Sequence, residues 1–175
     1  MCNMDAYQID LREVKDDVKT YHFHIDDDFF AAIQAPEITR GNLNVDLQVK
    51  KVASMFEVDI HSKGVIYIPC DICLDNMEQP IETHESLVVK MGVVGEENES
   101  DDYVTVHEEE GIFDASWYIY EFIILGIPIK HVHEPGKCNQ EMLKMLKEHQ
   151  VSDPDETAKP IDPRWNELLK IKDKD

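Results

Sequence analysis

Two cysteines separated by two residues carry the sharpest chemical signal in the sequence. Cys70 and Cys73 enclose Asp71 and Ile72, and Leu74 stands where a zinc knuckle usually carries a glycine. Two thiolates at this spacing on a tight turn can both reach one tetrahedral metal ion. A redox pair would instead need a thiolate at the N-terminus of a helix, and the surrounding residues are typical of strands and turns. The pair therefore favours a metal knuckle.

A second group of metal-binding side chains follows downstream. His133 and Cys138 are separated by four residues, which is within the usual spacing of two ligands of one ion. His131 is an alternative to His133. We therefore predict a site made of Cys70, Cys73, Cys138 and one of these histidines, with zinc as a possible cofactor. A reduced pair of thiols without a metal is the competing interpretation.

The segments on either side of the cysteine pair are predicted to form an antiparallel β meander. Apolar side chains alternate with polar ones over residues 43–49 and 56–60, which is typical of half-buried strands. Residues 62–64 are predicted to form a turn before a short strand at 65–68, because they end in glycine. Another strand is predicted over residues 81–91, so that the cysteine pair lies between two strands.

Helices are predicted in the C-terminal part of the chain. A helix capped by Asp114 or Ser116 extends to about Leu125, and its apolar residues cover almost every face, which is typical of a buried helix. A second helix is predicted from Asn139 to His149. It would face the core through four apolar residues, Met142, Leu143, Met145 and Leu146. A last helix is expected after Asp162 and Pro163, with Trp165 as a core anchor.

These elements predict an α+β fold, in which an antiparallel β meander with a Cys-x-x-Cys knuckle precedes two to three C-terminal helices. Residues 95–114 contain nine acidic and no basic residues, which indicates a solvated connector. A short edge strand is expected within it at residues 103–106. We expect one domain over residues 1–175, with a β-rich lobe (1–94), an acidic connector (95–114) and a helical lobe (115–175).

The net charge of −20 restricts the class of partner. Such a charge repels a phosphate backbone and favours a basic protein, a class that includes ribosomal proteins. Residues 1–129 contain 8 basic and 27 acidic residues, whereas residues 130–175 contain 9 and 10. Contact with RNA is therefore expected only in the C-terminal part, where Arg164 is a candidate. The longest apolar run is too short to span a bilayer and no signal peptide is apparent, so we expect a cytoplasmic protein.

Three stretches together resemble the YceD family, the large-subunit ribosomal RNA accumulation proteins. They are Cys70-Asp71-Ile72-Cys73-Leu74 followed by Pro80-Ile81-Glu82, then Glu121-Phe122-Ile123-Ile124-Leu125-Gly126-Ile127-Pro128, and finally Asp162-Pro163-Arg164 with Leu168. The resemblance covers roughly residues 40–170, and the order and spacing of the stretches make it specific.

The resemblance implies a β-rich domain with appended helices and a role in the synthesis, processing or stability of large-subunit ribosomal RNA. It also implies a metal site and suggests nucleic-acid binding. Many members carry a cysteine-rich stretch after the apolar segment, whereas here only Cys138 remains, beside His131 and His133. Cys70 and Cys73 are therefore the residues that match the family's metal site.

No motif for catalysis is present: the sequence has no glycine-rich phosphate loop, no Gly-x-Ser-x-Gly and no His-Glu-x-x-His. We therefore expect no enzyme, but a ribosome-biogenesis accessory protein that binds ribosomal precursor RNA or a basic ribosomal protein. Glu121 and Arg164 are the candidate binding residues. The alternatives are a zinc-binding nucleic-acid-binding module and a metal-dependent enzyme.

Overall fold

The structure is a computed structural model that describes residues 4–15, 17–92 and 103–150. The chain divides into two compact units, residues 1–138 and residues 139–175, and each is described by itself. Among the described residues, no helix is long and apolar enough to cross a membrane. The division into lobes at residues 94 and 115 stays a prediction.

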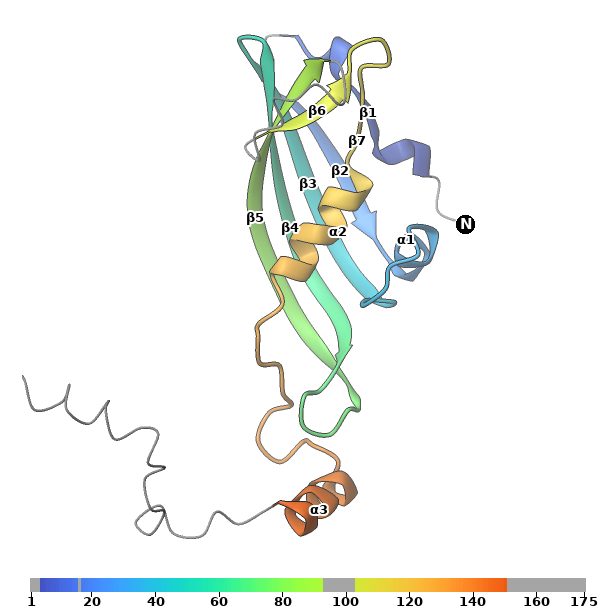
Figure 1. Cartoon of the computed structure of the whole chain (residues 1–175), viewed down its shortest axis with the longest axis vertical. Coiled ribbons are helices and arrows are strands. Elements are labelled where there is room, and N and C mark those ends of the chain that lie inside the picture. The colour runs from blue at the N-terminus through green and yellow to red at the C-terminus, as the bar shows by residue number, and fades with distance from the viewer. Residues whose placement is uncertain (1–3, 16, 93–102, 151–175) are drawn as a thin grey trace, which may run out of the picture. The chain divides into compact units, whose positions relative to one another are not determined.

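A five-stranded sheet is the main element of the larger unit (Figure 1). Its strands lie in the order β2 (Lys19–Ile25), β3 (Gly41–Val52), β4 (Met55–Pro69), β5 (Asn76–Gly92) and β6 (Val104–His107). The first four form an antiparallel meander, whereas β6 pairs with β5 in parallel. The predicted α+β fold and the edge strand near residue 104 are thus confirmed.

The predicted turn at residues 62–64 is wrong, because β4 runs through it without interruption. Gly64 lies opposite Leu43 in the ladder, and a Cβ atom at Gly64 would lie 2.2 Å from the carbonyl oxygen of Asn42. Gly64 therefore allows the backbones of β3 and β4 to approach closely. Such a close approach, and not only a turn, is a reason for glycine within a strand.

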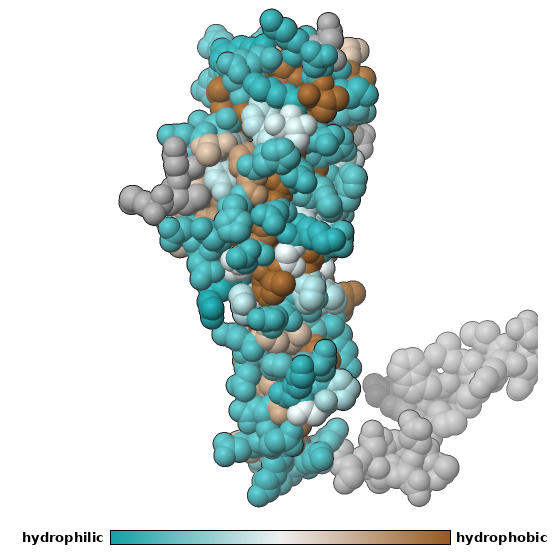
Figure 2. Space-filling view, turned by 180° about the vertical axis from the view of Figure 1, so that it is seen from behind, coloured by the Kyte–Doolittle hydropathy of each residue, from teal (hydrophilic) through white to brown (hydrophobic). Residues whose placement is uncertain are grey.

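The sheet has one apolar and one polar face, as the period of two predicts. Along β3, the alternate residues Leu43, Val45, Leu47 and Val49 are fully buried. The intervening residues are exposed, and Figure 2 shows this outer face as mainly hydrophilic, with scattered apolar side chains. All the covering elements must therefore lie on the inner face.

Two helices and a small sheet cover the inner face. Phe29 and Phe30 of α1 (Asp27–Ala32) are buried, and the ring of Phe30 lies edge-on to that of Tyr120 in α2 (Ser116–Leu125). The small sheet joins β1 (Gln8–Asp10) to β7 (Ile112–Asp114), next to the 3-10 helices η1 (Met4–Tyr7) and η2 (Leu11–Glu13).

Helix α2 ends at Leu125 as predicted, but its N-cap is Ala115, so the predicted cap at Asp114 or Ser116 is wrong. The Asp114 carboxylate instead accepts hydrogen bonds from the backbone N–H and the hydroxyl of Ser116, the first residue of the helix. The prediction that all of it is buried is wrong. Ile119, Tyr120 and Ile123 are buried against the sheet, whereas the side opposite exposes apolar residues as large as Trp117 and Leu125. The helix covers the sheet with one face only, as Figure 1 shows.

The second unit contains α3 (Gln140–His149), which confirms the predicted helix. The side chain of Asn139 caps its N-terminus by accepting from the N–H groups of Glu141 and Met142. None of its residues is buried, and Met145 and Leu146 are exposed, so the prediction of a core-facing stripe is wrong. The helix predicted after Asp162, with Arg164 and Trp165, lies outside the described residues.

Candidate metal centre

The turn between β4 and β5 holds Cys70 and Cys73. Pro69 ends β4, the Cys70 N–H donates to the Asp75 carbonyl oxygen, and the Leu74 N–H donates to the Cys70 carbonyl oxygen. Leu74 has a φ of 63°, in the left-handed region that favours glycine. Leucine thus adopts a backbone conformation that favours glycine, and the Sγ atoms of Cys70 and Cys73 lie within 4.8 Å of each other.

The segment after α2 is held against this turn by a clamp between Asp71 and His131. The Asp71 N–H donates to the His131 carbonyl oxygen at 3.0 Å, and the His131 N–H donates to the Asp71 carboxylate at 2.8 Å. The His131 Nε2 atom lies 3.2 Å from the other carboxylate oxygen. This clamp fixes the start of the segment that carries His133 and Cys138.

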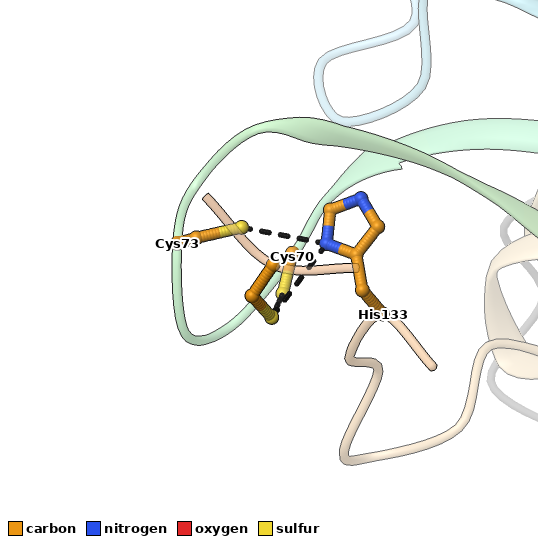
Figure 3. A group of neighbouring side chains, drawn as sticks. Cys70, Cys73 and His133 are labelled. Carbon is orange, nitrogen blue, oxygen red and sulfur yellow. Dashed lines mark hydrogen bonds between the residues drawn. The ribbon is translucent and has the colours of Figure 1, made fainter. Parts of the chain in front are cut away.

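Four possible ligands meet as a result. Cys70, Cys73, His133 and Cys138 each offer one atom, and the four atoms lie within 4.8 Å of one another. The Cys73 Sγ atom is 3.4 Å from His133 Nδ1, and Cys138 Sγ is 3.9 Å from both Cys70 Sγ and His133 Nδ1. Figure 3 shows the imidazole of His133 facing the sulfur atoms from the opposite segment.

The three separations of 3.4, 3.9 and 3.9 Å are close to the edges of a tetrahedral zinc site. With Zn–S bonds of about 2.3 Å and Zn–N bonds of about 2.0 Å, ligand atoms lie about 3.5 to 3.8 Å apart. Cys70 and Cys73 are buried, and His133 and Cys138 are partly buried. The cluster could therefore bind a metal such as zinc. Three sulfur donors and one nitrogen donor are also a ligand set that soft or borderline metals prefer.

Electrostatics at the turn favour a thiolate on Cys70. Burial opposes ionisation of this thiol, but backbone N–H groups of Cys73, Ile72 and His133 donate to its sulfur and lower its pKa to about 6. Burial and the neighbouring sulfur atoms raise the pKa of Cys138 to about 11. A bound cation would favour the thiolate form of both, because a metal displaces the proton of a coordinating thiol.

Four protein ligands complete a tetrahedral coordination shell. Zinc sites of this type hold protein segments together, whereas catalytic sites keep one position for water or substrate. An ion here would join the β4–β5 turn to the segment that follows α2. The arrangement therefore suits a structural role.

The structure brings together some of the predicted site residues and places others elsewhere. The structure brings Cys70, Cys73, Cys138 and His133 together, whereas His131 contacts Asp71. Glu121 is exposed on α2 and accepts a hydrogen bond from the Trp117 indole N–H at 2.7 Å. Arg164 lies outside the described residues. Sequence reasoning did not identify the role of Asp71, although a carboxylate enclosed by the two cysteines was a possible signal.

The sequence also matches a protein family, described as large ribosomal RNA subunit accumulation protein YceD, over residues 58–172. This match covers more than half of the chain. The protein belongs to the YceD family. Membership links it to the accumulation of large-subunit ribosomal RNA, and the matched region includes all four residues of the candidate metal centre. No curated protein and no solved structure matches the chain.

Proposed function

We propose that this YceD protein promotes the accumulation of large-subunit ribosomal RNA by binding a basic ribosomal protein, free or within an assembly intermediate. It would act as a non-catalytic accessory protein. The observation that carries the proposal is the combination of YceD membership with a net charge of −20. An acidic protein attracts basic ribosomal proteins and repels free RNA at long range.

Exposed carboxylates support the choice of a basic protein as partner. Asp26, Asp27 and Asp28 are exposed at the start of α1, and residues 108–110 form a second exposed acidic group after β6. Such groups would speed the encounter with a cationic partner and would make association weaken as salt rises.

We further propose that the four-residue cluster binds zinc and that the ion has a structural role. The support comes from the donor set, from the ligand separations and from the clamp between Asp71 and His131. Zinc would fix the segment that joins α2 to the second unit of the chain. Loss of zinc should therefore loosen this segment before it affects the core of the sheet.

The test is affinity capture of the tagged full-length protein from gradient fractions of a cell lysate, at low and at moderate salt. We expect particles that contain large-subunit precursor RNA, with ribosomal proteins that cross-link directly to the tagged chain. Absence of ribosomal material at both salt concentrations would contradict the proposal. Recovery of RNA alone, with affinity falling steeply as salt rises, would favour a nucleic-acid-binding module instead.

A further inference from the structure

An apolar groove runs along the exposed side of α2. One of its two hollows, of about 450 Å³, is lined by Trp117, Leu125 and Pro36 among others. The second, of about 380 Å³, is lined by residues that include Ile68 and Ile127. The two hollows are adjacent, because Glu37 and Ile124 line both, and we refer to them together as the groove.

Two carboxylates belong to this groove. Glu37 lines both hollows, and Glu121 lines the larger one. Both are exposed, and among the described residues neither forms an ion pair. Glu121 is held in place by the indole N–H of Trp117, while the Glu37 backbone N–H donates to the Tyr120 hydroxyl. The groove therefore combines apolar surface with two carboxylates that form no ion pair with the residues that the structure describes.

We infer that this groove binds a segment of a cationic protein partner, with apolar side chains in the two hollows and Lys or Arg side chains against Glu37 and Glu121. The inference rests on the proposed function, and it names the surface that would meet the basic ribosomal protein. An exposed Trp117, 46% accessible, and Leu125, 74% accessible, supply the apolar contact area that anchors such segments.

Charge decides between this occupant and the other candidates. RNA phosphates would be repelled by Glu37 and Glu121. A second copy of the chain would carry its own net charge of −20 toward the same surface. A cationic segment is the occupant whose charge complements the groove, and the ionic contacts would direct it to a surface that is otherwise apolar.

The experiment uses the full-length protein and short overlapping peptides that tile the large-subunit ribosomal proteins. The peptides that bind are then measured in solution by fluorescence anisotropy. The test variant is Glu37→Lys with Glu121→Lys, and the matched control is Glu57→Lys with Glu85→Lys, which changes the net charge equally at exposed positions of β4 and β5 outside the groove. Leu125→Asp tests the apolar contact. Near-ultraviolet circular dichroism and the thermal midpoint establish that each variant is folded.

We expect the bound peptides to combine apolar residues with Lys or Arg. The groove pair should weaken their binding about tenfold, and the control pair by less than about threefold. Leu125→Asp should weaken it about tenfold as well. Equal effects of the two charge pairs, or no peptide binding, would overturn the inference. If the wild-type chain still associates with precursor particles in that case, only the groove assignment fails; if it does not, the proposed function fails.

Discussion

Of the two histidines near the cysteines, His133 and not His131 is in a position to bind the metal. His133 Nδ1 lies 3.4 Å from Cys73 Sγ, whereas His131 contacts Asp71. We predict that His133→Ala abolishes stoichiometric zinc, and that His131→Ala keeps about one zinc ion per chain. Metal analysis of the purified proteins together with native mass spectrometry measures both. Retention of zinc by His133→Ala and its loss from His131→Ala would contradict the assigned ligand set.

Asp71 should act on the metal through position rather than by coordination. Its carboxylate accepts from the His131 N–H at 2.8 Å, and its own N–H donates to the His131 carbonyl oxygen. We predict that Asp71→Ala lowers zinc affinity about 10- to 100-fold without changing the metal stoichiometry at saturation. Competition with a chromophoric chelator measures the affinity. Asp71→Asn, which keeps one side-chain acceptor oxygen, should retain more of it, and equal losses in the two variants would contradict this role.

Leu74 adopts a backbone conformation that costs free energy for leucine. Its φ is 63°, and its side chain is 66% exposed, so that it contributes little packing. The left-handed conformation costs a residue with a Cβ roughly 1–2 kcal/mol, while glycine loses about 0.5–1 kcal/mol of chain entropy. We predict that Leu74→Gly raises the free energy of unfolding by up to about 1 kcal/mol. Chemical denaturation measures the free energy of unfolding, and a decrease of similar size in the Leu74→Gly variant would contradict the prediction.

The candidate site was predictable from the sequence because all its ligand types stand in two short stretches. Cys-x-x-Cys and His-x4-Cys spacings each allow binding to one ion, so Cys70, Cys73 and Cys138 could be named without a structure. The sequence could not choose between His131 and His133, because that choice depends on how the Asp71 clamp orients the segment. The left-handed backbone conformation of Leu74 could not be predicted either, because the sequence showed only that glycine is absent there.

Gly64 stands at a point where the backbones of β3 and β4 approach closely. A Cβ atom there would lie 2.2 Å from Asn42 O and 2.5 Å from Leu43 Cα, and backbone atoms cannot move away as a flexible side chain can. We predict that Gly64→Ala lowers the free energy of unfolding by about 3 kcal/mol. Gly92→Ala is the matched control in a neighbouring strand, because its Cβ would meet only Thr105 Cγ2 at 3.7 Å. Equal unfolding free energies for the two variants would refute this account of β3–β4 packing.

The strands were easier to predict than their ends or the burial of the helices. Alternation of apolar and polar residues identified β3, because only one face of that strand is buried. The same reasoning failed at Gly64, since glycine indicates either a turn or a close approach of two backbones, and only the partner strand decides. It also failed for α2, because apolar residues such as Trp117 and Leu125 do not show whether a covering element exists.

Charge acts at the scale of the whole molecule. Residues 1–129 contain 27 acidic and 8 basic residues, so their repulsion of RNA does not depend on any single carboxylate. A basic ribosomal protein bound to this acidic surface would bring the chain close to ribosomal RNA. Most of the surface of the chain would then not contact the RNA directly. The acidic composition thus supports the proposal that this YceD protein acts through a protein partner.

The most direct measurement is the affinity of the purified full-length chain for purified large-subunit precursor particles and for the same precursor RNA stripped of protein, at about 50 and about 200 mM salt. We predict saturable binding to the particles that weakens with salt, and binding to the stripped RNA that is at least about tenfold weaker. Equal or tighter binding to the stripped RNA would contradict the proposal that this YceD protein acts by binding a basic ribosomal protein.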